Sequence, residues 1–308
     1  MNPIVAYLFF PGFVFAAALG MFVNWFDRKV TARVQWRVGP PLLQPLYDIT
    51  KLLGKETVIP RGCSRGAFLL SPLFGLAAIT LVATLIGMAL LFPDRGFVGD
   101  LIVVLYFMMV PSVAVIVGAF ATKNPIASLG ASREMKLMLA DELPFLLAVA
   151  VPIIQAGGTI RLGQLVGYQS TYGWILGSFS GVIALVVALL SVQAKLTLVP
   201  FDLPEAETEI MGGAYVEYSG PPLAMFKLTR MMCHATFPML LVLLFLGGLD
   251  IHGWGILWSV LKYGVLLLLI TLIRNTNPRL RIDQAVRFFW GPMTVLGIGA
   301  VILVFLGL

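Results

Sequence analysis

Several stretches of the sequence run for more than 20 residues without a charged side chain, among them Ile4–Phe26, Ala67–Phe92 and Leu101–Thr122. A helix needs about 20 apolar residues to cross a lipid bilayer. Charged residues make up 12% of the chain, against about 25% in soluble domains, and the mean hydropathy is +0.95. These features exclude a soluble enzyme, a disordered chain and a nucleic-acid-binding module. They predict an integral membrane protein with no nucleic-acid partner.

The uncharged stretches are continuous and do not alternate between polar and apolar residues. Only helices and closed barrels satisfy all their backbone polar groups in lipid, and alternation is typical of barrels. The sequence therefore predicts an all-α integral membrane protein, with about eight transmembrane helices in a single transmembrane domain over 1–308. The predicted spans are Ile4–Phe26, Ala67–Phe92, Leu101–Thr122, Leu143–Ile160, Trp174–Ala194, Pro222–Leu249, Trp254–Ile273 and Phe288–Leu308, and residues 163–170 are predicted to be a loop or surface segment.

The basic residues predict the orientation in the membrane. The connections after the first, third, fifth and seventh spans hold 18 of the 21 lysines and arginines. Because cytoplasmic loops are enriched in these residues, we expect the odd-numbered connections to be cytoplasmic and both termini to lie outside. The chain is thus predicted to be a multi-pass protein of the cell (cytoplasmic) membrane.

The residues that usually bind metals are few. Cys63 and Cys233 lie far apart, and an iron–sulfur cluster needs about four thiolates. His234 falls within a predicted span and His252 in an outer loop, so the two histidines are not expected to ligate one haem. We therefore expect this chain to bind no metal and no cofactor. Any redox cofactor would belong to other subunits.

The segment 43–56 after the first span has the pattern of an amphipathic helix. Its apolar side chains follow helical spacing on one face, at Leu42, Leu46, Ile49 and Leu53. Its polar side chains follow the same spacing on the opposite face, at Gln44, Asp48, Lys51 and Lys55. This pattern predicts a helix at the cytoplasmic surface of the membrane. It is compatible with a simple anchor for the loop, or with a functional element that is either a roof or gate over a cavity or a dock for a soluble partner.

The fifth connection, 196–221, is dense in carboxylates, at Asp202, Glu205, Glu207, Glu209 and Glu217. So many neighbouring acids should raise the pKa of some of them, which suits a proton relay. The alternative is a solvated acidic loop. Three basic side chains, Lys227, Arg230 and His234, follow at helical spacing on one face of the sixth span, where they could meet the acids. Alternatively, the first two extend to the headgroups and His234 is a core histidine.

The third connection places acids beside the fourth span. Glu134 and Asp141 are seven residues apart, and Glu142 stands at the entry to that span. Ionisable groups at membrane depth are costly and are candidates for function. Pro144 and Pro152 can break or kink the helix and leave backbone carbonyls for water. Water beside a carboxylate is what a proton path needs.

Three separated segments resemble one family. They are Arg33–Pro40 with Leu42–Pro45, Leu129–Arg133 with Glu142, and Pro200–Glu207 with Glu217–Gly220. Their order and spacing are similar to the NuoH-like membrane subunits (mitochondrial subunit one) of proton-pumping NADH:quinone oxidoreductase and to the related subunits of membrane-bound [NiFe]-hydrogenases. The quinone-reducing members usually carry RxGPNxxGxxGLLQP, whereas here Pro41 is followed directly by Leu42. This missing insert and the stretch Pro221–Leu228 resemble the hydrogenase branch.

The resemblance implies a membrane anchor and proton-path connector in a ferredoxin-linked, ion-pumping complex. Its partners would be hydrogenase-like large and small subunits and an iron–sulfur subunit, carrying a [NiFe] centre and [4Fe-4S] clusters, together with antiporter-like membrane subunits. The docking face for the peripheral arm would be Arg28, Arg33, Arg37, Gln44, Asp48, Lys51 and Lys55. The proton relay would use Asp141, Glu142, Asp202, Glu205, Glu207, Glu209 and Glu217, with Arg133, Lys227, Arg230 and His234 as charge partners.

Four other interpretations stay open. The chain could form the quinone site of an NADH:quinone oxidoreductase, or belong to a related ferredoxin-dependent reductase with another acceptor. It could be a stand-alone secondary transporter, although the internal repeats common in that class are not found. It could also be a structural anchor whose acids are inert.

Overall fold

The computed structural model describes residues 2–250 and 253–307, without the side chains of Arg95, Glu207 and Thr208. The side chain of Glu207, a predicted relay residue, and the whole of His252 therefore lie outside the described residues. Throughout the described ranges the regular structure is helical, and no strand occurs in them. This confirms the prediction of an all-α membrane protein.

Seven helical segments in the described chain are long and apolar enough to cross a membrane. They are α1 (Pro3–Leu8) with α2 (Phe13–Val34), α4 (Arg65–Leu91), α5 (Asp100–Ala121), α6 (Pro125–Gln155), α10 (Gly220–Phe245), α11 (Gly255–Thr276), and α12 (Ile282–Phe288) continued through the π-helical turn Phe289–Met293 into α13 (Thr294–Phe305). The shorter apolar helix α8 (Phe179–Lys195) is the eighth. The described residues therefore contain the predicted eight apolar helices, of which α8 is shorter than a typical span.

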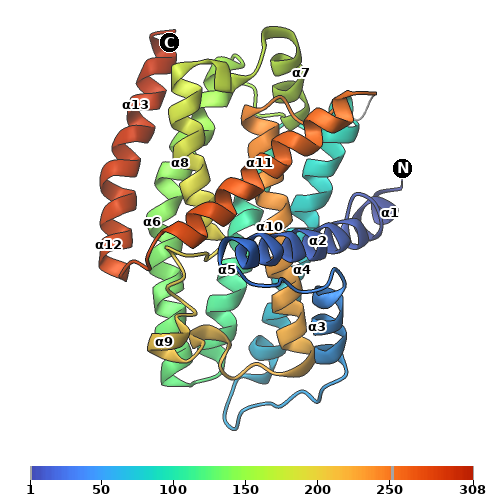
Figure 1. The fold of residues 1–308 in the computed structure, drawn as a ribbon, viewed down its shortest axis with the longest axis vertical. Coiled ribbons are helices and arrows are strands. Elements are labelled where there is room, and N and C mark those ends of the chain that lie inside the picture. Colours follow the sequence, from blue (N-terminus) through green and yellow to red (C-terminus); the bar gives the residue numbers. More distant parts are fainter. Residues whose placement is uncertain (1, 251–252, 308) are drawn as a thin grey trace.

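Helix α10 forms the centre of the bundle. It packs against α2, α4 and α8, and its residues from Met231 to Phe245 are buried with the single exception of Met239. Figure 1 shows α2 and α11 inclined across one side of the bundle, while α6, α8 and α13 run side by side at another. A helix buried on all sides must be apolar nearly all round, so the charges Lys227 and Arg230 are confined to the first part of α10.

The two ends of the bundle differ. Figure 1 shows α3 (Gln44–Leu53) and α9 (Glu207–Ile210) at one end, here called the α3 end. Helix α7 (Leu162–Tyr172) and the C-terminus lie at the opposite end, here called the α7 end. Helix α3 lies within the amphipathic segment predicted over 43–56 and confirms that this segment is helical, with Ile49 of its apolar face buried.

The fourth predicted span begins in the wrong place. We expected Leu143–Ile160 after a charged loop, but α6 begins at Pro125, capped by Asn124, and continues through Pro144 and Pro152 to Gln155. Two of the charges that suggested a loop lie on the inward face of this helix, where Glu134 is 4% exposed and Asp141 is 1% exposed. A gap between charges marks a helix end only if the charges face solvent.

Two further boundaries differ from the prediction. Helix α2 continues to Val34, eight residues beyond the predicted end of the first span, because Asp27 is buried within it. Residues 163–170 are not a loop but most of α7, whose first backbone N–H groups are partly satisfied by the buried Asp100, at 2.8 Å from the N–H of Leu162. The positions of charged residues along the sequence do not show that Asp27 and Asp100 are buried, so the prediction missed both boundaries.

The C-terminal end of α10 is capped by other helices. The side-chain amide of Gln169, from α7, donates to the carbonyl oxygens of Leu243 and Leu244 at 2.9 and 3.2 Å. Lys262, from α11, donates to the carbonyl oxygen of Leu246 at 2.7 Å and lies 4.3 Å from the ring centroid of Trp174. The last carbonyls of a helix have no partner within it, so these contacts satisfy polar groups that are costly inside a membrane.

Helices α2 and α10 approach closely at Gly20. A Cβ atom at this position would lie 2.7 Å from the carbonyl carbon and oxygen of Met231. Because overpacking against rigid backbone costs about 1–3 kcal/mol, we predict that Gly20→Ala lowers the melting temperature of the purified complex. Gly264→Ala in α11 meets no atom within 4 Å and is the matched control. Equal melting temperatures for the two variants would contradict this packing.

Candidate functional site

A polar cavity of about 490 Å³ opens at the α3 end between α2, α3, α10, α11 and the loop that follows α8. Its walls are rich in ionisable side chains. Those that line it are Asp27, Arg28, Asp48, Asp202, Glu205, Lys227, Arg230, His234, Arg274 and Arg279. The cavity therefore brings together residues from the predicted docking face, the acidic loop and the basic stripe.

Helix α3 is fixed to α2 at the edge of this cavity. The Arg28 guanidinium lies 3.0 Å from Asp48 Oδ2, and the Gln44 amide donates to Asp48 Oδ1 at 2.9 Å. Burial opposes ionisation of Asp48, but these two hydrogen bonds outweigh it and hold the pKa of the Asp48 carboxyl below its usual value. Three predicted docking residues thus bind one another, while Arg33, Arg37, Lys51 and Lys55 are exposed.

An ion pair that the sequence did not indicate also lines this cavity. Asp27 of α2 is buried, pairs with Arg274 of α11 and accepts a hydrogen bond from Thr271 at 3.0 Å. His234 lines the same cavity and is buried, and its Nε2 atom has no hydrogen-bond partner among the described residues. The first span was predicted to end one residue before Asp27, so this acid was counted as part of a loop.

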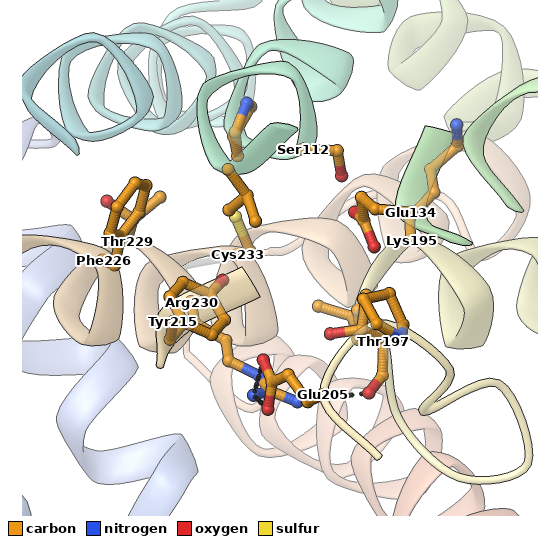
Figure 2. Close-up of a pocket in the computed structure, with 14 residues that line it drawn as sticks. Ser112, Glu134, Lys195, Thr197, Glu205, Tyr215, Phe226, Thr229, Arg230 and Cys233 are labelled. Atoms are coloured by element: carbon orange, nitrogen blue, oxygen red, sulfur yellow. Dashed lines mark hydrogen bonds and ion pairs between the residues drawn. The ribbon is translucent and has the colours of Figure 1, made fainter. Parts of the chain in front are cut away.

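The predicted meeting of the acidic loop and the basic stripe occurs at Glu205 and Arg230. The Arg230 guanidinium pairs with both carboxylate oxygens of Glu205 and also donates to the carbonyl oxygen of Thr197 at 3.1 Å. Figure 2 shows this pair on one side of a second, smaller cavity, with Ser112, Glu134 and Lys195 on the other side. The pair stands between the two cavities because it lines both.

The second cavity, of about 40 Å³, is lined by Glu134, whose carboxylate can accept a further hydrogen bond. Glu134 accepts a hydrogen bond from Ser112 of α5, and its Oε2 atom has no partner among the described residues. Tyr215, on the loop side, also lines this cavity, and burial raises its pKa well above the usual value. One buried water needs roughly 10–15 Å³ of such volume, so a few water molecules fit here.

Deeper along α6 a third cavity, of about 10 Å³, touches Glu134, Asp141 and Lys195. The ammonium of Lys195, at the end of α8, lies 3.1 Å from Asp141 Oδ2 and 2.5 Å from Glu142 Oε2. The volume is close to that of a single water molecule. Because neighbouring cavities share lining residues, Glu205, Glu134 and Asp141 follow one another from the open cavity into the bundle.

The remaining predicted relay residues lie elsewhere. Asp202 lines the open cavity 2.7 Å from Arg279, and burial, with help from Glu205, raises its pKa. Glu209 pairs with Arg133 at 2.6 Å, and its side chain is 54% exposed. Glu217 accepts a hydrogen bond from Asn124 at 2.5 Å. The structure therefore divides these three predicted relay residues into two groups. Asp202 lines a cavity, whereas Glu209 and Glu217 hold the loop to α6 and its capping residue.

Glu134 and Lys195 are the main members of this site that were not among the predicted relay and partner residues. The seven-residue spacing of Glu134 and Asp141 was the available signal, since it puts both on one face of a helix. Lys195 was grouped with the basic residues of a loop, and nothing in the sequence pairs it with α6. Its ion pairs join residues 53 and 54 positions apart in the chain.

The sequence matches the NADH dehydrogenase family over residues 6–305. The chain belongs to this family. It is 34% identical to the H subunit of the NADH-quinone oxidoreductase of Brevibacillus brevis over 294 residues, which cover 89% of this chain and 85% of the relative. It is 36% identical to the corresponding subunit of Anoxybacillus flavithermus over 281 residues, with 86% and 82% covered. The NuoH-like resemblance inferred from the three sequence segments is thereby confirmed.

A similar fold is found in a solved respiratory complex. A chain of the membrane-bound sulfane sulfur reductase, an archaeal respiratory membrane complex, superposes with a TM-score of 0.84 at 26% identity, covering 94% of this chain and 96% of that one. The present chain is therefore a multi-pass subunit of a respiratory membrane complex of the complex I family, alongside other membrane subunits.

The contribution of the Asp27–Arg274 ion pair to stability can be tested by removing its charges. Removing one partner of a buried pair costs about 3–5 kcal/mol, and partial exposure of Arg274 favours the lower end. We predict that Arg274→Met lowers the melting temperature of the purified complex, whereas Arg274→Met combined with Asp27→Asn recovers most of the loss. Arg287→Met, at an exposed arginine, serves as the control. Additive losses in the double variant would refute the pairing.

Proposed function

We propose that this chain anchors a cytoplasmic redox arm and carries protons into the membrane in a hydrogenase-type, ferredoxin-linked complex. In this proposal the α3 end faces the cytoplasm and both termini lie outside. The observation that carries it is the succession of buried carboxylates, Glu205, Glu134 and Asp141, along cavities that share their lining residues. Carboxylates buried inside a membrane protein, whether in the bilayer or at its edge, are functional candidates because their burial is costly.

The chemistry is transfer of a proton between carboxyl groups through water. Asp202, with its raised pKa, suits the first acceptor in the open cavity. The proton then reaches Glu205, whose pairing with Arg230 fixes its position. From there it passes through the second cavity to Glu134 and on to the cluster of Asp141 and Glu142. Each step moves one proton and leaves the carboxylate that it came from ready for the next.

The exposed residues of the α3 end support the docking role. Arg33, Arg37, Lys51 and Lys55 project there, and Trp36 and Val38 are 98% and 97% exposed. Large apolar side chains so exposed beside basic ones are typical of a protein–protein interface. The proposed partners are the hydrogenase-like large and small subunits and an iron–sulfur subunit, which would hold the [NiFe] centre and the [4Fe-4S] clusters. The antiporter-like membrane subunits would receive the proton path.

The lining of the open cavity favours a polar ligand over a quinone. Sites for lipophilic ligands are lined mostly by apolar and aromatic side chains with few polar groups. Here ten ionisable residues line the cavity, against only two apolar ones, Leu198 and Met231. This supports an acceptor bound by the partner subunits rather than a quinone beneath α3. A ferredoxin-dependent reductase with another acceptor is the second candidate, favoured by the structural likeness to the sulfane sulfur reductase.

The identity of the terminal electron acceptor is tested on the purified complex. Nickel content and hydrogen evolution from reduced ferredoxin are measured beside reduction of polysulfide and of a short-chain quinone. The hydrogenase-type proposal expects nickel and hydrogen evolution. Polysulfide reduction without nickel would favour the second candidate, and quinone reduction with NADH would overturn both.

The relay is tested by charge-neutral substitutions. We predict that Glu134→Gln or Glu142→Gln reduces proton translocation by at least about a hundredfold in proteoliposomes that contain the complex, since amides do not relay protons as carboxyls do. Glu207→Gln is expected to behave in the same way. Asp283→Asn, at an exposed acid of α12, is the matched control. Normal assembly is verified by subunit composition. Unchanged translocation in Glu134→Gln and Glu142→Gln would leave the structural anchor as the explanation.

A further inference from the structure

Lys195 occupies the inner end of the succession of carboxylates. Its ammonium lies between Asp141 and Glu142, at 3.1 and 2.5 Å, and 5.0 Å from the centroid of the Phe145 ring. The side chain is 6% exposed. A cation is thus built into the chain at the one place where these two carboxylates converge.

The charge of this cluster leaves room for one more positive charge. With all three groups ionised, two carboxylates and one ammonium carry a net charge of −1. Net charge is costly in a low-dielectric interior, so the cluster favours uptake of one further cation. The candidates for an ion-pumping complex are a proton and a sodium ion.

The surroundings distinguish these two cations. A hard metal cation takes about six oxygen ligands, and the adjoining cavity has space for about one water molecule. The lining side chains that carry oxygen are Ser112, Glu134 and Asp141, too few for such a shell, and Met108, Met109 and Leu137 offer none. Asp141 Oδ2 already faces the ammonium, which repels a second cation at contact distance. A proton needs no coordination shell and binds directly to a carboxylate oxygen.

We propose that Lys195 is the ion-selectivity residue of this path, because it holds the cation position between Asp141 and Glu142, admits a proton and excludes sodium. This inference rests on the proton path proposed above. In the step concerned, the Glu134 carboxyl gives its proton to a water molecule. That water gives one of its own protons to the Asp141 carboxylate. Glu134 ends ionised, Asp141 ends neutral, and Lys195 remains an ammonium throughout.

The test compares sodium chloride with choline chloride in proteoliposomes that contain the whole complex. We expect Lys195→Gln, which removes the cation and supplies an amide oxygen, to slow proton translocation about tenfold in sodium relative to choline. The wild type and Lys195→Arg keep the cation and are expected to show no such added sensitivity. Lys195→Gln with Asp141→Asn keeps the net charge of the cluster at −1 but removes the proton acceptor, so, should the single variant fail to assemble, the double variant is read only by the sodium-induced spectral change described next.

A second readout does not require turnover. Infrared difference spectra of the purified complex are expected to show a sodium-induced shift of a carboxylate band in the glutamine variants and not in the wild type or Lys195→Arg. If neither the rate ratio nor the band responds to sodium in the glutamine variants, the selectivity role is wrong even though Glu134→Gln blocks translocation. If Glu134→Gln translocates normally, the proton path itself is wrong.

Discussion

Buried charge has to be neutralised inside the bundle, and this requirement decides which helices pack together. Lys195 joins α8 to α6 through Asp141 and Glu142, and Arg274 joins α11 to α2 through Asp27. These contacts add charge pairing to the hydrogen bonds and apolar surfaces through which the same helices meet, and apolar surfaces have little hydrophobic force between them in lipid. The same pairs bring the carboxylates into one region. Packing and the candidate site therefore have a common physical origin.

Sequence patterns were sufficient for the features that depend on local spacing. The apolar runs gave the number and type of spans, and the spacing of Leu46 and Ile49 gave helix α3. Patterns were insufficient where a charge is neutralised by a distant residue. Glu134 and Asp141 were taken to lie in a loop because their partners, Ser112 and Lys195, come from other helices. Such pairings depend on tertiary contacts, which spacing along one chain does not encode.

The central helix is held differently at its two ends. At the α7 end, Gln169 and Lys262 bind its last carbonyl oxygens, so α10 is fixed there by side chains from two other helices. At the α3 end it meets the loop through the pair of Arg230 and Glu205, beside an open cavity. In the proposed function, rearrangements that accompany redox chemistry in the docked arm would act at the α3 end, where the carboxylates lie.

The length of α6 sets how far its carboxylates reach into the bilayer. At 1.5 Å per residue its 31 residues extend for about 46 Å, whereas the hydrocarbon layer is about 30 Å thick. Counting about 20 residues back from Gln155 ends near Lys136, which is exposed. Glu134 then stands at headgroup depth and Asp141 only one to two turns inside. In the proposed path most of the dielectric barrier thus remains beyond Asp141, so the membrane potential acts chiefly on steps in the neighbouring subunits.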